Sequence, residues 1–249
     1  HPWQPLVTAV ERVDSTNNAC KRLAAEGAPD GTAVLTGMQT AGRGRRGRTF
    51  VSPPGGLYFS LILRPHARPE ALMHLTAMVA VAAARAIERV SGVYPGIKWT
   101  NDLVLGKKKL CGILTESSLL PDGSAAWLVV GIGVNVGQAS FPPDIADMAT
   151  SLALQELDVS PDALADAILA QLTAMRTLLT DPVEWLAEYR RRCVNLGRPV
   201  RVLRGNTVRQ ATALAIDEQF GLTVQYENGE TETVRSGEVS VRGLYGYIE

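Results

Sequence analysis

The amino-acid sequence predicts an α+β fold, in which helices flank a mixed, largely antiparallel sheet and a small β-unit forms the C-terminal end. Apolar runs of strand length follow one another through short turns instead of alternating with helices, which favours a mixed sheet over a doubly wound one. Two late helical patterns open on a capping residue followed by proline, at Ser160-Pro161-Asp162 and Asp181-Pro182. From Gly197 onward, short strand-like runs alternate with Gly and Asn turns.

The elements of the first domain are predicted from capping residues, apolar runs and turn residues. Asp14-Ser15-Thr16-Asn17 supplies N-cap candidates for a short helix over residues 19–26, which Gly27 ends. Pro69 suits the first turn of a long helix over residues 70–90, whose Ala-rich face suits packing on a sheet. The strands are predicted over residues 32–38, 57–63, 97–99, 103–105, 109–117 and 126–136, the last two joined by the turn Pro121-Asp122-Gly123.

The C-terminal part is predicted to contain two helices and then a separate β-unit. The helices cover residues 161–179 and 182–193. The strands that follow are predicted over residues 199–203, 210–216, 222–226, 232–235 and 239–242, with Asn228-Gly229 as a hairpin turn. We therefore divide the chain into a main domain, 1–195, and a small domain, 196–249. About 50 residues lie near the lower size limit for independent folding, so we expect the small domain to pack on the main one.

Composition excludes several classes of protein. The 249 residues carry 25 Lys+Arg and 25 Asp+Glu, which argues against a protein that binds polyanions with its whole surface. The three cysteines, Cys20, Cys111 and Cys193, form neither a C-x-x-C pair nor a disulfide framework, which favours the reducing cytoplasm. The longest apolar stretch, residues 77–84, is far shorter than the roughly 18 residues that span a bilayer. We expect no signal peptide, no membrane association and no zinc finger.

A loop rich in arginine and glycine is the most unusual local feature. Gly42-Arg43-Gly44-Arg45-Arg46-Gly47 matches G-x-G-x-x-G, but the Pro53-Pro54 that soon follows does not permit the helix that a dinucleotide site needs. Glycines let a backbone approach a ligand closely, and guanidinium groups bind phosphate or carboxylate in a bidentate manner. We expect the loop, with Arg48 at its end, to be mobile when empty and to order around an anion. The alternative is a solvated basic loop or a nucleic-acid patch.

Three further segments place polar groups or glycines at strand ends. Lys98-Trp99-Thr100-Asn101-Asp102 combines a cation, an aromatic ring, an amide and a carboxylate. Lys109 begins an apolar strand and is expected to point inward, whereas Lys107 and Lys108 stay solvated. Glycines within Gly131-Ile132-Gly133-Val134-Asn135-Val136 weaken a strand, which often means that something approaches its backbone. An ordinary polar corner and close packing against a helix are the alternatives.

Five blocks, taken in this order, resemble the biotin–protein ligases. They are Asp14 to Asn17, Gln39-Thr40-Ala41-Gly42 to Arg48, Lys98 to Asp102, Lys109-Leu110-Cys111-Gly112-Ile113-Leu114, and Gly131 to Val136. Gly237-Glu238-Val239-Ser240-Val241-Arg242 resembles the family's small SH3-like β-barrel. The resemblance covers roughly residues 10–140 of the main domain and implies the fold of a class II synthetase-like catalytic domain.

The resemblance implies a reaction in two steps. The carboxylate of biotin attacks the α-phosphate of Mg-ATP to give biotinyl-5′-AMP and pyrophosphate, and a lysine of a biotin carboxyl carrier domain then takes the biotinyl group and releases AMP. The resemblance makes Lys109, Arg45 and Asp102 the catalytic candidates. It implies a biotin and adenylate site at Ser15, Thr16, Asn17, Gln39, Arg43, Gly44, Arg45, Arg48, Lys98, Asn101, Lys109, Gly112, Leu114, Gly131, Gly133 and Asn135.

Individual roles follow from the same resemblance. Ser15, Thr16 and Gln39 would bind the ureido ring, the arginine loop would close over biotin and phosphate, and Asn101 and Asn135 would face the adenylate. Asp102 would either help to deprotonate the acceptor lysine or bind Mg²⁺. Thr100 and Phe50 depart from the family pattern, which usually has Pro and Trp there.

Two rival functions remain. A lipoate–protein ligase shares the fold and the adenylate chemistry, although lipoate has no ureido ring. A non-enzymatic nucleic-acid-binding module would use the arginine loop and would not need Lys109. Only 13 residues precede Asp14, so we expect no helix-turn-helix domain and no DNA binding through this chain. A homodimer is possible, since family members often dimerise.

Overall fold

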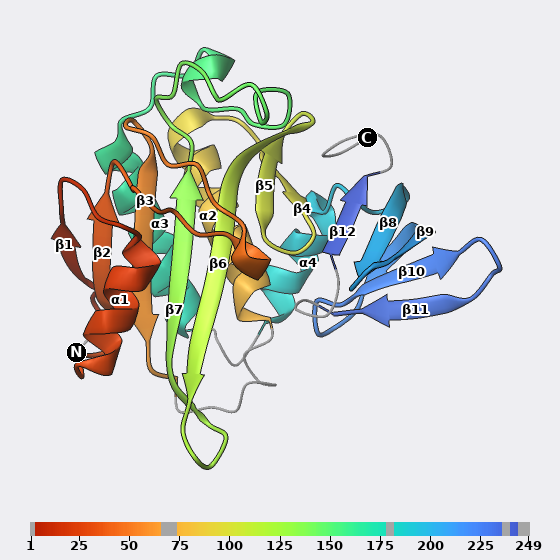
Figure 1. Cartoon of the computed structure of the whole chain (residues 1–249), viewed down its shortest axis with the longest axis horizontal. Coiled ribbons are helices and arrows are strands. Elements are labelled where there is room, and N and C mark those ends of the chain that lie inside the picture. Colours follow the sequence, from red (N-terminus) through yellow and green to blue (C-terminus); the bar gives the residue numbers. More distant parts are fainter. Residues whose placement is uncertain (1–2, 66–73, 178–181, 236–239, 244–249) are drawn as a thin grey trace.

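The computed structural model describes residues 3–65, 74–177, 182–235 and 240–243 (Figure 1). They form a seven-stranded sheet in the order β1-β2-β3-β7-β6-β5-β4 and a five-stranded sheet in the order β11-β10-β9-β8-β12. In the larger sheet the strands are β1 (Leu6–Ala9), β2 (Thr32–Thr36), β3 (Leu57–Leu63), β4 (Gly96–Lys98), β5 (Asp102–Leu105), β6 (Lys108–Leu119) and β7 (Ala125–Val134). In the smaller sheet they are β8 (Pro199–Arg204), β9 (Thr207–Ile216), β10 (Leu222–Tyr226), β11 (Thr231–Val234) and β12 (Ser240–Gly243).

The strand pairing confirms a mixed, largely antiparallel sheet. Only β1 and β2 run parallel among the described strands, and every other pair is antiparallel. Strand β1, which has only four residues, all of them exposed, is not predicted from the sequence. By contrast, β3 has the predicted bounds and is buried along its whole length, since helices cover both faces of the sheet there.

In the described part of the chain, four α-helices accompany the larger sheet: α1 (Thr16–Ala25), α2 (Leu75–Ser91), α3 (Pro161–Thr177) and α4 (Val183–Arg192). Within the described residues, short 3₁₀ turns at Arg45–Gly47 and Ala153–Gln155 lie in loops. Helix α1 packs on one face of the sheet, against β2, β3 and β7, whereas α2 and α3 lie together on the other face (Figure 1). None of the described helices is long and apolar enough to cross a bilayer.

Two helix starts differ from those predicted. Helix α1 begins at Thr16 instead of residue 19, because Ser15 already has extended backbone and Thr16 and Asn17 are buried against the sheet. Helix α2 begins at Leu75 within the described residues, and the predicted start at Pro69 lies outside them. The Ala-rich face of α2 is completely buried, as predicted, so that the helix backbone approaches the sheet closely.

The C-terminal sheet packs on the main domain through aromatic and main-chain contacts. Trp99 Nε1 donates to the Phe220 carbonyl at 2.9 Å, and the Tyr189 and Phe220 rings meet edge to face with centroids 5.4 Å apart. Arg190 Nε donates to the Ile216 carbonyl at 2.9 Å. The Trp99 side chain thus joins the corner between β4 and β5 to the small β-unit.

A buried ion network holds α2 and α4 together. Glu188 is almost fully buried and accepts from Arg85 Nε at 2.7 Å and from Arg192 Nε at 2.8 Å, and Arg192 also pairs with Glu88. Burial alone would raise the pKa of Glu188, but the two arginine hydrogen bonds outweigh it and lower the pKa below its usual value. Glu188 is therefore a carboxylate at neutral pH.

We expect Glu188→Gln to cost about 3 kcal/mol of unfolding free energy at pH 7, because it breaks a buried pair and leaves arginine charge uncompensated. Because folding lowers the pKa of Glu188, its carboxylate stabilises the folded state fully above the pKa of the unfolded state, near 4.5. This stabilisation is lost as the pH falls through the lower pKa of the folded state. The free energy of unfolding, measured with urea between pH 7 and pH 3.5, should therefore fall less steeply with decreasing pH for Glu188→Gln than for the parent. Glu184→Gln, an exposed position on the same helix, is the control. Equal acid slopes for the parent and Glu188→Gln would contradict the expectation.

Candidate active site

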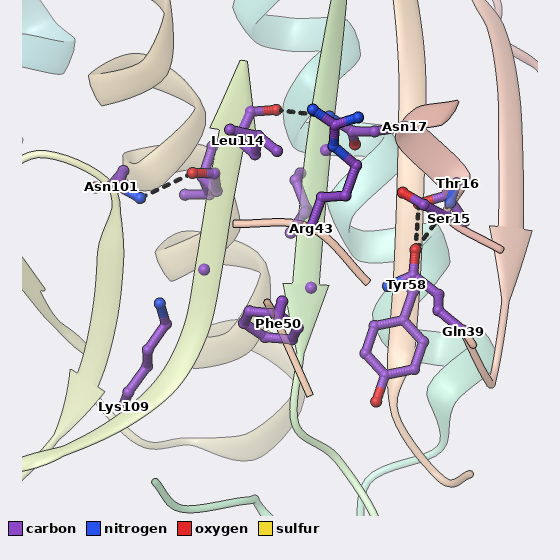
Figure 2. Close-up of a pocket in the computed structure, with 15 residues that line it drawn as sticks. Ser15, Thr16, Asn17, Gln39, Arg43, Phe50, Tyr58, Asn101, Lys109 and Leu114 are labelled. Carbon is purple, nitrogen blue, oxygen red and sulfur yellow. Dashed lines mark hydrogen bonds between the residues drawn. The ribbon is translucent and has the colours of Figure 1, made fainter. Parts of the chain in front are cut away.

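A pocket opens on the face of the sheet that carries α1, over the middle of β6 and the last residues of β7. The space inside it that the centre of a water-sized sphere can reach is about 40 Å³. Figure 2 shows Lys109 and Asn101 on one side of this pocket, Thr16 and Gln39 on the other, and Phe50 between them. The lining residues are Ser15, Thr16, Asn17, Gln39, Arg43, Phe50, Tyr58, Asn101, Lys109, Gly112, Ile113, Leu114, Gly131, Ile132 and Gly133.

Glycines form the floor of the pocket. Gly112 on β6 is the cross-strand neighbour of Gly133 on β7, and the Phe50 ring lies over both. A Cβ on Gly112 or Gly133 would lie 2.9 Å from that ring, and a Cβ on Gly131 would lie 1.9 Å from Asn17 Oδ1. These glycines are required by close approach, since none of the three has positive φ.

Hydrogen-bonding groups from α1, the loop after β2, and β3 line one end of the pocket. Gln39 Oε1 accepts from the Thr16 amide at 2.8 Å and from the Thr16 hydroxyl at 3.2 Å, and Gln39 Nε2 donates to Ser52 Oγ at 2.8 Å. Ser60 Oγ lies 2.7 Å from Thr16 Oγ1 and from Asn17 Oδ1. This network fixes which way each amide points, so donors and acceptors are set before a ligand arrives.

A lysine and a carboxylate stand at the other end. Lys109 Nζ forms an ion pair with Asp102 Oδ1 at 2.7 Å and lies 5.4 Å from the centre of the Phe50 ring. Asn101 Nδ2 donates to Asp102 Oδ1 at 3.2 Å and to the Ile113 carbonyl at 2.9 Å. A lysine–aspartate pair therefore stands at this end, with the Asn101 amide beside it.

A β-bulge turns Lys109 toward the pocket. Asp102 pairs with Gly112 and Leu103 with Cys111, but Val104 pairs with Lys109, so the register shifts by one residue. Leu110 and Cys111 are both buried, and Lys109 lies over Gly112 on the pocket face. Bulges often re-aim a side chain beside an active site.

The arginine loop is attached to both sides of the pocket. Arg43 donates to Asn18 Oδ1 at 3.0 Å and to Glu116 Oε1 at 3.0 Å on one side. Arg45 donates to Asn101 Oδ1 at 2.8 Å on the other, and burial lowers the pKa of its guanidinium. Arg46 has a φ of 56°, and the Gly44 amide donates to the Arg48 carbonyl at 2.7 Å, which together make a tight turn between the two attachments.

Comparison with known proteins agrees with this geometry. The model of the biotin/lipoate A/B protein ligase family matches residues 9–135, and that of the biotin protein ligase C-terminal domain matches residues 196–242. The chain is 32% identical over 245 residues to a biotin–[acetyl-CoA-carboxylase] ligase of Paracoccus denitrificans, covering 93% of this chain and 99% of that protein. The chain belongs to the biotin/lipoate A/B protein ligase family. The resemblance inferred from the five sequence blocks is confirmed.

Other members of the family show how far the similarity extends. The chain is 43% identical over 143 residues to the bifunctional ligase/repressor BirA of Bacillus spizizenii. The matched region covers 56% of this chain and 44% of that protein. This chain therefore spans less than half the length of that relative. A structure of biotin protein ligase from Aquifex aeolicus in complex with biotin and ATP superposes with a TM-score of 0.81 at 28% identity, over 95% of this chain and 98% of the other.

Most candidates from the five blocks meet in the pocket. Ser15, Thr16, Asn17, Gln39, Arg43, Asn101, Lys109, Gly112, Leu114, Gly131 and Gly133 line it. Gly44, Arg45, Arg48, Lys98, Asp102 and Asn135 do not, although Arg45 and Asp102 contact lining residues. Lys98 is buried on β4, and Arg48 is exposed at the end of the loop. Lys108 is not simply solvated as expected, because its Nζ donates to the Ala146 carbonyl at 3.0 Å.

Asn135 is buried just beyond the end of β7. Its Nδ2 donates to the Thr150 carbonyl at 2.9 Å, and its Oδ1 has no hydrogen-bond partner in the described part of the chain. A buried acceptor without a donor costs free energy, so the group is set to receive a donor from a ligand or water.

Four lining residues were not among the candidates: Phe50, Tyr58, Ile113 and Ile132. Tyr58 donates to the Pro53 carbonyl at 3.0 Å, and burial raises its pKa to about 12, so it is a neutral wall of the pocket. Tyr58 lies on β3, which is buried on both faces, so no alternation of apolar and polar residues marks the side that faces the pocket. Phe50 stands out in the sequence only as a departure from the usual Trp.

The protein residues at this site do not by themselves make a metal centre. Among the described residues there is no group of three or more His, Cys, Asp or Glu side chains that could hold a metal ion. Asp102 is the one carboxylate against Lys109, and its Oδ1 is already engaged by Lys109 and Asn101. Mg²⁺ keeps several waters and usually binds one or two carboxylates together with substrate phosphates. The donor set does not fit a resident Mg²⁺.

Proposed function

We propose that this chain is an ATP-dependent biotin–protein ligase, which converts biotin to biotinyl-5′-AMP and transfers it to a lysine of a biotin carboxyl carrier domain. One observation carries the proposal. A single glycine-floored pocket joins a fixed set of amide and hydroxyl groups at one end to Lys109 at the other. That arrangement complements a ligand with a ureido group, an apolar body and a carboxylate.

Binding begins at the polar end. The ureido ring of biotin offers two N–H donors and one carbonyl acceptor, which Ser15, Thr16, Asn17 and Gln39 would satisfy from α1 and the loop after β2. The apolar ring and tail would lie against Leu114 and the Phe50 ring, which itself covers Gly112 and Gly133. The carboxylate would then reach Lys109.

The first chemical step joins two anions. A carboxylate oxygen attacks the α-phosphorus, forming the acyl–phosphate bond while the bond to pyrophosphate breaks. Fixed cations lower this barrier, because they offset negative charge as it accumulates on the reacting oxygens. Lys109 supplies one such cation, and the loop with Arg43, Gly44, Arg45 and Arg48 supplies the others. Asn101, Lys98 and the unpartnered Oδ1 of Asn135 are assigned to the adenylate side.

Asp102 is assigned a role in the second step. It holds Lys109 by a 2.7 Å ion pair until substrate oxygens compete for that lysine, which frees the carboxylate. The acceptor lysine, with an ordinary pKa near about 10.4, must lose a proton before its nitrogen attacks the acyl carbon and expels AMP. A freed Asp102 is positioned to take that proton. Mg²⁺ is assigned to the phosphates of ATP, and we derive no step through Asp102 as a metal ligand.

The wider assignments rest on the same family relationship. We propose that residues 1–195 form the catalytic domain and 196–249 the small domain, and that the macromolecular partner is a biotin carboxyl carrier domain. The three cysteines are free and buried, which supports a reducing, cytoplasmic environment.

The deciding experiment is to incubate the chain with Mg-ATP and either biotin or lipoate, and to identify the adenylate by mass spectrometry together with released pyrophosphate. Biotin-dependent biotinyl-AMP is the expected result. A lipoyl-adenylate instead would overturn the choice of substrate, and the absence of both products would overturn the ligase assignment.

We expect Arg45→Gly to release biotinyl-AMP about 100-fold faster than the parent and to biotinylate lysines indiscriminately, because it removes the 2.8 Å attachment of the loop to Asn101. A closed loop excludes water, and the acyl-adenylate hydrolyses when water reaches it. Release is measured by rapid filtration after single-turnover synthesis. Arg46→Gly, whose side chain is exposed, is the control and should retain the intermediate. Equal retention by Arg45→Gly and the parent would show that the attachment does not seal the site.

A further inference from the structure

Glu116 is a carboxylate beside the pocket that the proposed chemistry does not use. It lies on β6, two residues beyond Leu114 and four beyond Gly112, so alternation along the strand puts the Glu116 and Leu114 side chains on the same face as Gly112, which is the pocket face. Its side chain is only 20% exposed, which is unusual for a glutamate without a structural or functional partner.

Glu116 receives donors from α1 and from the arginine loop. Its Oε1 accepts from Lys21 Nζ at 2.9 Å and from Arg43 Nη2 at 3.0 Å, and its Oε2 accepts from Asn17 Nδ2 at 3.0 Å. Burial alone would raise the pKa of Glu116, but hydrogen bonds from Lys21 and Asn17 and the charges of Lys21 and Arg43 lower it overall. The group is therefore an anion at neutral pH.

The contact with Asn17 sets the direction of a pocket amide. Asn17 Nδ2 faces two acceptors, Glu116 Oε2 and the Leu114 carbonyl at 3.3 Å, while Asn17 Oδ1 accepts from Ser60. Reversing the amide would place its NH₂ against the serine hydroxyl and its oxygen against a carboxylate. Glu116 thus keeps one orientation of a residue that lines the pocket.

The contact with Arg43 attaches the arginine loop to the pocket wall. Arg43, Arg45, Arg46 and Arg48 repel one another, and Glu116 is the carboxylate that offsets this charge at the Arg43 end. The other end is attached through Arg45 and Asn101. The loop is therefore held across the pocket at two points, one of which depends on Glu116.

We propose that Glu116 is a positioning residue of the ligase: it acts through Arg43 and Asn17 to hold the arginine loop across the pocket. The proposal rests on the proposed function only where biotin is concerned, since the contacts that attach the loop are made by this chain's own residues.

Trypsin tests the attachment directly, because it cleaves after arginine and the loop contains four. Cleavage follows the population of the open loop when opening is fast. We expect Glu116→Gln to raise the rate of cleavage after Arg46 and Arg48 about tenfold, and to raise the Kd for biotin by a similar factor, as the loss of one charge-assisted hydrogen bond implies. The thermal unfolding midpoint is recorded for each variant to separate local from global opening.

Two further variants complete the test. Lys21→Gln removes another partner of Glu116 but leaves Arg43 in place, so loop cleavage should match the parent. Arg43→Gln breaks the same contact from an exposed side chain and should open the loop equally, and adding Glu116→Gln to it should give no further increase. Unchanged cleavage in Arg43→Gln, or in a folded Glu116→Gln, would overturn the proposal. Faster cleavage with no biotin binding in the parent would support the attachment and instead refute the ligase function.

Discussion

Lys109→Gln is expected to slow the formation of biotinyl-AMP about 1,000-fold at saturating biotin and ATP, with little change in stability. The lysine stands where carboxylate and phosphate oxygens must meet, and removal of one fixed group that stabilises developing charge typically costs about 100- to 1,000-fold in kcat. Its side chain also covers Gly112 and pairs with Asp102, so some loss of biotin affinity should accompany the loss of rate. Pyrophosphate release in single-turnover conditions measures the step.

Two controls separate chemistry from folding. Lys107→Gln changes an exposed lysine two residues earlier, in the turn before the strand, and should leave the rate within twofold of the parent. Lys109→Arg keeps the charge but spreads it over a planar group, so partial activity is expected. If Lys109→Gln kept the parental rate, Lys109 would not be the catalytic cation, and that role would be assigned to the arginine loop.

The sequence predicted which residues line the pocket better than it predicted the geometry of that pocket. The β3 strand has its predicted bounds because Pro53-Pro54-Gly55-Gly56 marks its start and an apolar run fills it. The exposed β1 strand was not predicted: three of its four residues are apolar, but the run is short and has no buried face. Local patterns thus predict an element only where one face of it meets the core.

The inward direction of Lys109 was predicted, but its cause was not. A regular strand would alternate Lys109 away from Gly112, and the bulge opposite Val104 is what turns it onto the pocket face. The bulge depends on how β5 and β6 pair, which is a property of two strands. The ion pair with Asp102 follows from the same pairing, so the sequence could offer base and metal roles for Asp102 but not its engagement with Lys109.

Gly131→Ala is expected to abolish detectable biotin binding and to lower the free energy of unfolding by about 2–3 kcal/mol. The new Cβ would lie 1.9 Å from Asn17 Oδ1, and added volume in a packed site typically costs about 1–3 kcal/mol. Gly133→Ala, two residues further along the same strand, is the matched comparison. Its Cβ would meet the edge of the Phe50 ring at 2.9 Å, and that ring can move, so the loss of stability should be smaller.

A double variant assigns the cause. Replacing Asn17 by alanine in the Gly131→Ala background removes the atom that the new methyl group strikes, so most of the lost stability should return. Biotin affinity should not return, because the Asn17 amide and its hydrogen bonds to Ser60 and Glu116 are gone. Chemical denaturation and calorimetric titration with biotin measure the two quantities separately. Recovery of binding along with stability would show that Gly131 serves only packing, and that Asn17 is a wall of the pocket whose amide the ligand does not need.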